Sequence, residues 1–321
     1  MCGTCGCSDG DSVTMTDPAT GAETILREAR ARSDHNHRHV HTHADGTTHA
    51  HDHNDDHARA HSHSYDHGHD HGHDHGHGHD HSHHDHGDHH SHSPTQAHGA
   101  DDGLVALQTA VLAKNDAVAA QNRGWFRGRG VLALNLVSSP GAGKTSLLER
   151  TIRDFGGEID IAVIEGDQMT TNDADRIRAA GARAIQINTG SGCHLEADMV
   201  ASALDALALR AGSLLLIENV GNLVCPAMFD LGERMKVAVI SVTEGEDKPL
   251  KYPHMFRAAS VVVVNKIDLA AHVDFDQAAF LANIKAVNPS AQIIMTSART
   301  GEGMENWRAF LKQEMVKQAQ T

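Results

Sequence analysis

One stretch of the sequence limits what this chain can fold into: residues 131–148, VLALNLVSSPGAGKTSLL. An apolar run is followed by Ser-Ser-Pro, then by Gly-Ala-Gly-Lys-Thr, and then by a pattern typical of a helix. Glycines let the backbone approach a phosphate closely, and successive N–H groups at a helix N-terminus favour negative charge there. The order of strand, tight loop and helix therefore predicts a phosphate-binding loop in an α/β domain.

The side chains of this loop suit a nucleoside triphosphate. Lys144 can reach the β- and γ-phosphates, and the Thr145 hydroxyl can hold Mg²⁺. Ser138 stands where the usual pattern has its first glycine. A chance glycine-rich turn is the alternative, and the preceding strand and the intact Gly-Lys-Thr argue against it. The loop residues expected to contact nucleotide are Gly141, Ala142, Gly143, Lys144, Thr145 and Ser146.

Composition divides the 321-residue chain at about residue 103. Of the 29 histidines, 26 lie between His35 and His98, and residues 1–103 carry a net charge of −13 with histidine neutral. The remainder has a net charge of −2, which gives no electrostatic case for nucleic-acid binding. We therefore expect three regions: a Cys-motif segment with a linker over 1–34, a disordered His-rich region over 35–103, and a globular nucleotide-binding domain over 104–321.

The first seven residues, MCGTCGC, hold Cys2, Cys5 and Cys7. Small residues between them let the chain wrap around a metal ion, and removal of the initiator methionine would add an amine as a fourth donor. Three thiolates and one nitrogen suit Ni(II), although Zn(II) and copper also favour thiolates. A redox Cys-x-x-Cys motif, the alternative, normally lies beside a βαβ unit. We interpret residues 8–34 as a polar linker with one short helix over Glu23–Arg30.

The histidine tract is of low complexity, as in HDHGHDHGHGHDHSHHDH over residues 69–86. Almost no apolar side chain is available there to offset the entropy of ordering, so we expect disorder. Neutral imidazoles bind nickel, zinc, copper and cobalt, which predicts loose binding of several ions. That binding should weaken as the pH falls through the imidazole pKa of about 6.5. A solubilising spacer is the plainer alternative.

From Leu104 onward, apolar runs alternate with helical patterns. A first helix should present Leu104, Leu107, Val111 and Leu112 on one face and end at the Gly-rich stretch 123–128. Buried strands alternating with helices predict a mostly parallel, doubly wound sheet of the P-loop NTPase class, with ligands at the carboxyl ends of its strands. The expected strands are 131–137, 161–164, 185–187, 214–217, 237–242, 261–264 and 293–295. The expected later helices are 172–180, 195–207, 280–287 and 307–315.

A guanine-reading motif follows one of these strands. Asn265-Lys266-Ile267-Asp268 matches the NKxD pattern of GTPases and comes about 120 residues after the phosphate loop. Guanine presents N1–H and an exocyclic amine, both of which Asp268 can accept, whereas adenine would leave that carboxylate unpaired. A Ser-Ala-Arg sequence after the last strand is similar to the further guanine-contacting loop of GTPases. The predicted contacts to the base are Asn265, Lys266, Asp268, Ser297 and Ala298.

Two further strands end in acidic residues. Asp167 ends the strand after the phosphate-loop helix, and Glu218 ends a later strand ahead of Gly221, where a switch glycine would sense the γ-phosphate. We place Asp167 first and Glu218 second as the carboxylate for Mg²⁺ or the attacking water. A solvated strand-end carboxylate is the alternative for each. Phosphoryl transfer needs mainly positioning and charge neutralisation, so the catalytic residues expected are Lys144, Thr145 and Asp167.

A second candidate metal set consists of Cys193, His194 and Cys225, each shortly after a predicted strand end. Two cysteines and one histidine are too few for a closed four-ligand zinc site, but a symmetric dimer could pool ligands across its axis. The alternative is that the cysteines merely pack and that the histidine is an ordinary loop residue.

Targeting signals and cysteine usage point to one compartment. No apolar run approaches 18 residues, so we expect no transmembrane helix, and no signal peptide precedes the first cysteines. Five cysteines in such a chain favour free thiols or metal ligands over disulfides. We expect a cytoplasmic protein without membrane or nucleic-acid partners.

Together these motifs resemble the hydrogenase nickel-incorporation GTPases, the HypB family, over residues 104–321. The strings VIEGDQ, INTGSGCHL, IENVGNLVCPA, SVTEGEDKPLKYPHMF and NKID are far more specific than a phosphate loop alone. Ser138 is no departure, because family members read SSPG there. The resemblance implies a dimeric P-loop GTPase with GTP or GDP and Mg²⁺, and a tight nickel site plus a weaker nickel or zinc site coupled to the nucleotide state. Their ligands would be Cys2, Cys5 and Cys7 in the first, and Cys193, His194 and Cys225 in the second.

The function that the resemblance implies is GTP-driven delivery of nickel, through a partner maturation protein, to the large subunit of a nickel–iron hydrogenase. The histidine tract would store the ion. Two rivals remain open: a GTPase serving urease maturation, and a protein mainly for nickel storage or detoxification. The Cys leader and the GCHL and VCPA strings favour hydrogenase over urease. Leu269 and Val273, four residues apart after the NKxD motif, are expected at a dimer contact.

Overall fold

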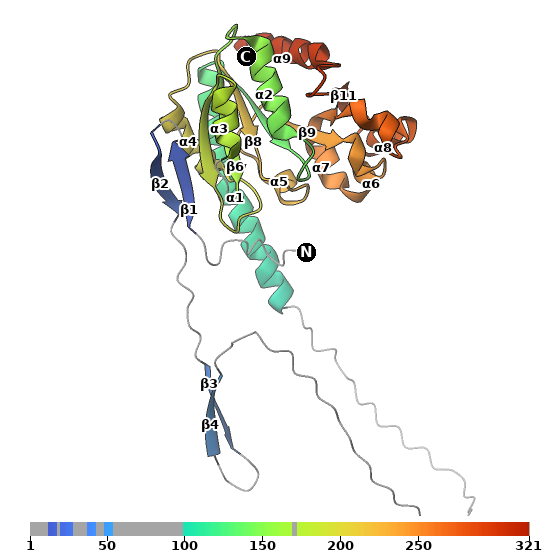
Figure 1. Cartoon of the computed structure of the whole chain (residues 1–321). Helices are drawn as coiled ribbons and strands as arrows, with labels where there is room; N and C mark the ends of the chain where they lie inside the picture. Colours follow the sequence, from blue (N-terminus) through green and yellow to red (C-terminus); the bar gives the residue numbers. More distant parts are fainter. Residues whose placement is uncertain are drawn as a thin grey trace, which may run out of the picture. The chain divides into compact units, whose positions relative to one another are not determined.

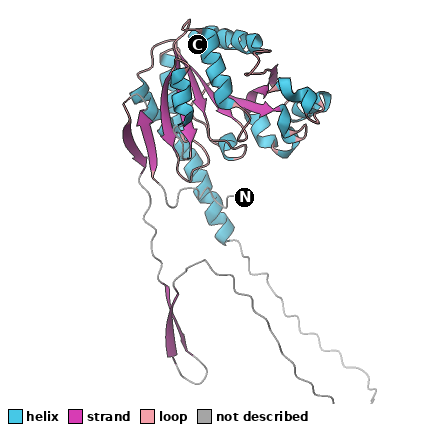
Figure 2. Ribbon diagram, in the orientation of Figure 1, coloured by secondary structure: helices cyan, strands magenta, loops and turns pink. Residues whose placement is uncertain are grey.

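Among the residues that the structure describes, nine strands form one sheet with helices on both of its faces (Figures 1 and 2). The computed structural model describes residues 12–17, 20–27, 37–42, 48–53, 99–168 and 172–320. These belong to two compact units, one of Met1–Arg32 with Ala100–Thr321 and one of Ser33–Gly99. No helix in the described part is both long and apolar enough to cross a membrane.

The sheet of the first unit has the strand order β11-β10-β9-β5-β8-β6-β7-β1-β2. Neighbours from β11 to β7 run parallel, whereas β1 is antiparallel to β7 and β2 is antiparallel to β1. The mostly parallel sheet predicted from the sequence is therefore confirmed. The strands are β1 (Val13–Asp17), β2 (Ala22–Arg27), β5 (Leu132–Val137), β6 (Ile161–Asp167), β7 (Arg183–Asn188), β8 (Leu214–Glu218), β9 (Met235–Ser241), β10 (Ala259–Asn265) and β11 (Gln292–Met295).

Alternate side chains of the central strand β5 belong to two different hydrophobic cores. Leu134 faces a core that also holds Phe155 of α2 and Trp307 of α9, and Ala133 faces a core shared with Met199 of α4. Both faces of the sheet are thus sealed by helices, which leaves its edges and strand ends for ligands. The helices are α1 (Gly99–Gly128), α2 (Lys144–Phe155), α3 (Asn172–Ala179), α4 (Ala197–Leu207), α5 (Cys225–Met228), α6 (Lys248–Lys251), α7 (Pro253–Ala258), α8 (Gln277–Val287) and α9 (Met304–Ala319), with 3₁₀ turns at Val242–Glu244 and Ile267–His272.

The first helix is longer than the sequence suggests. α1 continues through the stretch 123–128, where we expected a break, and the chain leaves it only at Gly130 (φ 64°). Phe126 is buried against the second core, and Arg129 lies over the Trp125 ring at 4.5 Å. Burial of this aromatic turn outweighs the poor helix propensity of the glycines around it.

The helix expected over Glu23–Arg30 is wrong, because residues 22–27 form strand β2. β1 and β2 make a hairpin that turns at Gly21 (φ 69°), and β1 pairs with the edge of β7. An unpaired edge of a parallel sheet offers a row of free backbone groups, and pairing with it overrides a weak local helix preference. Part of the stretch interpreted as a linker therefore extends the sheet.

The second unit contributes two described strands. β3 (His37–Thr42) and β4 (Thr48–His53) pair antiparallel, with Val40 opposite Ala50. The rest of the histidine tract lies outside the described residues, as do Cys2, Cys5 and Cys7. The predictions made for them stay predictions.

Candidate nucleotide and metal site

The phosphate loop leaves the carboxyl end of β5 and enters α2. Gly141 (φ 78°) and Gly143 (φ 96°) take left-handed backbone conformations that other residues adopt only under strain. Lys144 Nζ donates to Ser138 Oγ at 2.8 Å, so the ammonium lies folded over the loop. Ser138, in the place of the usual glycine, thus holds the lysine where phosphate oxygens would bind.

Thr145 lies against the carboxylate of Glu218. Its Oγ1 donates to Glu218 Oε1 at 2.9 Å, and β8, which ends at Glu218, pairs directly with β5. The second oxygen, Oε2, is buried and has no hydrogen-bond partner among the described residues. A hydroxyl beside a carboxylate with an unused oxygen is the hard oxygen donor set that Mg²⁺ favours, so these residues fit the ion.

Asp167, which we placed first for this role, makes its described hydrogen bonds to residues that follow β6 and β7. Its carboxylate accepts from the backbone N–H of Gln168 at 2.7 Å, and its carbonyl accepts from Thr189 N–H at 2.9 Å. Glu218, placed second, is the carboxylate that touches the phosphate loop. The geometry therefore favours Glu218 over Asp167 as the acidic partner of Thr145.

A further carboxylate, Glu165, was not singled out from the sequence. It lies opposite Glu218 across the β6–β8 pair and is only 2 % exposed. Burial, and then the negative charge of Glu218, raise its pKa to about 9. Burial likewise raises the pKa of Glu218 to about 7, although the Lys144 charge and the Thr145 hydrogen bond oppose the rise. The available signal was a carboxylate inside the otherwise apolar run IAVIE.

Replacing Glu165 with glutamine is expected to make stability less dependent on pH. The unfolded chain releases this proton near pH 4.5 and the folded chain keeps it to about pH 9, so between these values the folded state binds more protons. The free energy of unfolding of the native sequence then falls as the pH rises, by up to ~1.4 kcal/mol per pH unit from this group. Urea unfolding at pH 6, 7 and 8, without nucleotide or metal, measures the slope.

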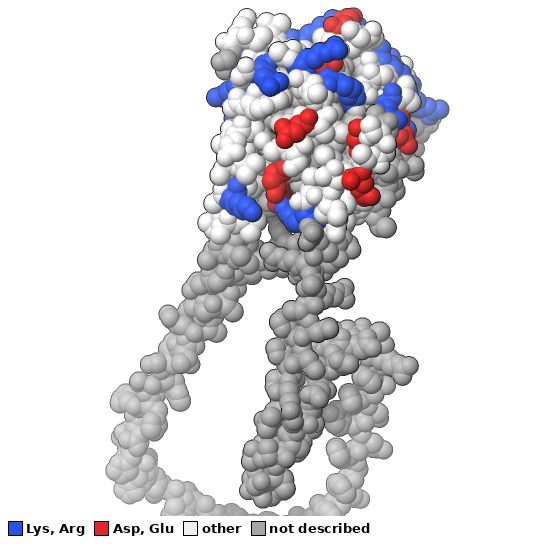
Figure 3. All heavy atoms as spheres, turned by 90° about the vertical axis from the view of Figure 1, so that its left-hand side faces the viewer, with Lys and Arg blue, Asp and Glu red and all other residues white. Residues whose placement is uncertain are grey.

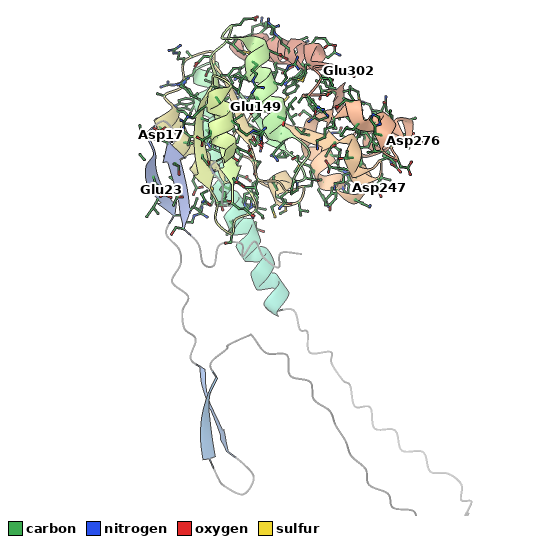
Figure 4. The ribbon with its side chains drawn as sticks, in the orientation of Figure 1. Asp17, Glu23, Glu149, Asp247, Asp276 and Glu302 are labelled. Carbon is green, nitrogen blue, oxygen red and sulfur yellow. The ribbon has the colours of Figure 1, made fainter. Side chains whose placement is uncertain are left out.

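The matched control is Glu302→Gln, at an exposed position in the loop between β11 and α9 (Figure 4). It should leave the slope of the native sequence unchanged. A Glu165→Gln slope equal to that of the native protein would show that Glu165 is ionised in the folded state.

Two residues of the NKxD motif donate hydrogen bonds to backbone carbonyls of the phosphate loop. Asn265 Nδ2 donates to the carbonyl of Ala142 at 3.1 Å, and Lys266 Nζ donates to the carbonyl of Gly141 at 2.7 Å. Lys266 itself has a left-handed backbone (φ 61°). A Cβ at Gly143 would come within 2.6 Å of Asn265 Nδ2, so only glycine permits this contact.

Asp268 and the Ser-Ala loop after β11 form one hydrogen-bonded group. Ser297 Oγ donates to Asp268 Oδ1 at 2.6 Å, and Ala298 N–H donates to Asn265 Oδ1 at 3.1 Å. They line a pocket of about 490 Å³ that also includes Gly143 and Ser146. The five residues predicted to read guanine are thus gathered beside the phosphate loop.

Arg176 of α3 is a second residue that the sequence did not single out. It pairs with Glu149 of α2 at 3.1 Å, and its Nη2 lies 3.4 Å from Ser146 Oγ. No motif in the sequence marks it, because its partners lie about thirty residues away in the chain.

The structure brings together the three residues of the second candidate metal set. One ligand atom each of Cys193, His194 and Cys225 lie within 4.8 Å of one another, and Cys193 Sγ is 3.5 Å from His194 Nδ1. His194 stacks on Phe229 with ring centroids 3.8 Å apart, and its Nε2 is buried without a partner in the described part of the chain. Burial is the main cause that lowers the pKa of His194, which favours the neutral, metal-binding imidazole.

Asn219 connects the loop that carries Cys193 and His194 to strand β5. Its Oδ1 accepts from Leu195 N–H at 3.1 Å, directly after His194, and its Nδ2 donates to Asn135 Oδ1 of β5 at 3.2 Å. Leu195 in turn packs against Gly166, where a Cβ would lie 2.8 Å from its side chain. The loop that carries Cys193 and His194 is therefore held by β5 and β8, the strands that also hold the phosphate loop.

Comparison with known proteins supports the family resemblance seen in the sequence. The family model for the CobW/HypB/UreG nucleotide-binding domain matches residues 132–295. The hydrogenase maturation factor HypB of Rhizobium leguminosarum bv. viciae is 59 % identical over 216 residues, which are 67 % of this chain and 72 % of that protein. This chain belongs to the HypB family.

Two solved HypB structures have the same fold. HypB from Archaeoglobus fulgidus is 43 % identical with a TM-score of 0.60, and the match covers 64 % of this chain and all of that one. HypB from Helicobacter pylori, solved in complex with nickel, is 40 % identical with a TM-score of 0.61 and covers 65 % of this chain and 98 % of that one. The P-loop nucleotide-binding fold of the family is therefore shown for this chain.

Proposed function

We propose that this protein hydrolyses GTP and uses the nucleotide cycle to deliver nickel to the large subunit of a nickel–iron hydrogenase during its maturation. One observation carries the proposal: a guanine-type nucleotide pocket and a Cys193, His194, Cys225 cluster share the carboxyl edge of one sheet, joined through Glu218 and Asn219. The family relationship to hydrogenase maturation factors supports the client, and the nickel complex of a relative supports the cargo.

The nucleotide half of the mechanism follows from the side chains. Asp268 accepts from guanine, Asn265 and Lys266 hold the loop, and Lys144 meets the phosphate oxygens in exchange for Ser138. Thr145 and Glu218 would hold Mg²⁺, which supplies neutralisation of phosphate charge. Lys144 is buried, which keeps this interaction in a low-dielectric site, where it is stronger than in water.

The metal half requires two sites in our proposal. Cys193, His194 and Cys225 bind nickel, or zinc, in the nucleotide domain, and two protomers of a dimer complete the coordination. Cys2, Cys5 and Cys7 bind nickel tightly in the leader, and the histidine tract stores it. A partner maturation protein receives the ion in the cytoplasm.

A deletion strain tests the client. Hydrogenase and urease activity are measured without this gene at low and high nickel, and again after complementation with the native gene, with Lys144→Ala, and with a gene lacking residues 35–98. Loss of hydrogenase alone, partly restored by excess nickel and not by Lys144→Ala, supports the proposal. The gene without the tract should restore hydrogenase at high nickel.

Two other results would change the proposed function. Loss of urease instead of hydrogenase would keep the GTPase and change the client. Intact activity of both enzymes with raised nickel sensitivity would make the protein a nickel store.

Leu269 and Val273 are proposed to contribute to the dimer contact. Val273 is 36 % exposed, and Leu269 is half-buried at the rim of the nucleotide pocket. Replacing both with alanine removes apolar area from the contact and is expected to raise the dimer dissociation constant by about tenfold or more. Sedimentation velocity over a concentration series measures it. The control is Ile25→Ala, another exposed apolar residue, and an unchanged dissociation constant in the double variant would reject this contact.

A further inference from the structure

Helix α1 carries two buried asparagines, which are unusual in the interior of a long helix. Asn115 and Asn122 are both buried, and their spacing of seven residues places them on one face of the helix with the buried Ala119 between them. A buried amide is costly unless its donors and its acceptor are hydrogen-bonded. The partners of these two side chains therefore show what this face of α1 holds in place.

Asn115 supplies a cap for α4. The first N–H groups of a helix have no partner inside the helix, and the side chain of the residue before α4 makes no capping hydrogen bond. Asn115 Oδ1 accepts from Ala197 N–H at 2.9 Å, and its Nδ2 donates to the carbonyl of Asp230 at 2.7 Å. One amide thus joins the start of α4 to a chain segment more than thirty residues later.

Asn122 makes the same connection two turns further along α1. Its Nδ2 donates to the carbonyl of Ala197 at 2.8 Å and to the carbonyl of Leu231 at 3.0 Å. Both backbone polar groups of Ala197 are therefore bound by α1, together with the carbonyls of two successive residues of the later segment.

The two segments that α1 joins are those that carry the metal cluster. Ala197 comes three residues after His194, and we call residues 193–197 the first metal segment. Asp230 comes five residues after Cys225 and directly after Phe229, whose ring stacks on His194 with centroids 3.8 Å apart. We call residues 225–233 the second metal segment. The position of Cys225 relative to His194 therefore depends on contacts with α1.

Close packing and an ion pair also hold α1 to the second metal segment. Gly232 has a left-handed backbone (φ 89°), and a Cβ there would lie 2.6 Å from the carbonyl oxygen of Ala119. Arg123 Nη2 donates to the carboxylate of Asp230 at 2.7 Å, and both of these side chains are partly exposed. A shift of this segment along α1 would break both contacts.

A buried carboxylate connects the second metal segment to β5. On the face that Figure 3 shows, basic and acidic side chains are interspersed at the surface, whereas Glu233 is only 6 % exposed. Its Oε2 accepts from Leu231 N–H at 2.7 Å, and its Oε1 accepts from Asn135 Nδ2 at 3.2 Å and from Lys236 Nζ at 2.8 Å. Because Asn135 also accepts from Asn219, β5 is connected to both metal segments.

We propose that α1 preforms the metal site of the nucleotide domain. Asn115 and Asn122 are positioning residues that fix the first metal segment relative to the second, so that nickel meets three ligands that are already gathered. This inference rests on the proposed function, because it requires that these ligands bind nickel. β5 connects the two segments to the nucleotide through Asn219, whereas α1 sets their spacing in every nucleotide state.

Removing either amide leaves buried backbone groups without partners. In Asn115→Ala, the N–H of Ala197 and the carbonyl of Asp230 lose their hydrogen bonds, a loss that is relieved when the two metal segments separate and admit water. Nickel binding must then bring the segments together again. The free energy of that ordering is taken from the binding free energy, so nickel affinity falls.

The test is a nickel titration of the full-length leader variant, Cys2→Ala/Cys5→Ala/Cys7→Ala. Its thiolate-to-nickel absorption reports only Cys193 and Cys225, because these are then the only cysteines of the chain. The histidine tract has no thiolate and gives no such bands. A competing chelator of known affinity fixes the free nickel concentration, so that nickel held by the tract does not alter the titration.

Three substitutions on α1 are added to the leader variant. Asn115→Ala and Asn122→Ala should each weaken nickel binding by about tenfold or more. They should also change the energy or intensity of the thiolate-to-nickel bands, because the sulfur atoms no longer hold the same geometry. Arg123→Ala removes only a partly exposed ion pair, so it should fold as the native chain does and weaken nickel binding by about threefold.

Two controls separate the metal site from general stability. Asn288→Ala is matched to the buried amides, because Asn288 is buried and its Nδ2 donates at 2.9 Å to the carbonyls of both Phe256 and Ala259. Arg178→Ala removes an exposed ion pair on α3 and is matched to Arg123→Ala. Both controls should keep the nickel affinity and the absorption spectrum of the leader variant.

The failures are distinguishable. If Asn288→Ala weakens nickel binding as much as Asn115→Ala, or if all three α1 variants bind nickel as the leader variant does, the role of α1 is wrong and the proposed function stands. Where a buried substitution prevents folding, Arg123→Ala decides by the same criterion. If the leader variant itself shows no thiolate-to-nickel bands, the domain site binds no nickel, and the metal half of the proposed function fails as well.

Discussion

Replacing Asp268 with asparagine is expected to weaken binding of GTP and GDP by about 10²- to 10⁴-fold and to favour xanthine nucleotides instead. The native carboxylate faces two donors of guanine, whereas asparagine would place its own N–H₂ group against one of them. Xanthine has a carbonyl in place of the exocyclic amine and can accept from that N–H₂ group. Asp268 is suited to this role because Ser297 Oγ orients it at 2.6 Å within the pocket. Competition titrations with GDP and XDP measure the change.

The control for this prediction is Asp276→Asn. Asp276 caps α8 by accepting from Ala279 N–H at 2.9 Å and does not line the pocket (Figure 4). It should leave the ratio of GDP to XDP affinity as in the native protein, and stability should change little because asparagine caps a helix about as well as aspartate. An Asp268→Asn protein that still prefers GDP would mean that another group reads the base.

The nucleotide pocket was predictable from the sequence because the residues within each of its motifs determine the local conformation. The glycines of the phosphate loop are required by positive φ angles at Gly141 and Gly143, and the NKxD residues reach back to the same loop. Periodicity also located the parallel strands, because strands buried on both faces consist almost wholly of apolar residues. Each of these signals is local in sequence.

The choice between Asp167 and Glu218 was not predictable in this way. Both end an apolar strand, but β8 lies next to β5 in the sheet and β6 lies one strand further away. Strand order is a tertiary property, so no local pattern assigns the neighbour of the phosphate loop. The same reason explains the error at β2, whose strand conformation depends on the free edge of β7.

The second large effect that we expect is coupling between nucleotide binding and nickel binding. Nickel affinity at the Cys193, His194 and Cys225 site is expected to differ between the GDP and GTP-analogue states by about 5- to 150-fold. The connection is short: β8 ends at Glu218 against Thr145, and seven residues later the chain reaches Cys225. Between them Gly221 lies so close to Pro140 of the phosphate loop that an added Cβ would be 3.1 Å from it.

Asn219→Ala should remove most of this coupling while leaving the ligands in place. Asn219 accepts from Leu195 N–H and donates to Asn135, so it joins the His194 loop to β5, the strand that leads into the phosphate loop. Without it, movement at Glu218 no longer sets the position of His194. Nickel titrations of a leader variant, Cys2→Ala/Cys5→Ala/Cys7→Ala, in each nucleotide state isolate the domain site.

Reciprocity supplies an internal check. If nickel affinity changes by a given factor between the two nucleotide states, the preference for GTP analogue over GDP must change by the same factor when nickel binds. Asn283→Ala is the matched control, since Asn283 Nδ2 of α8 donates at 2.9 Å to the carbonyl of Glu246 in the loop before α6. It should preserve both factors. Equal nickel affinity in the GDP and GTP-analogue states of the native domain would show that the shared sheet edge transmits nothing, and nickel release would then need a partner protein rather than hydrolysis.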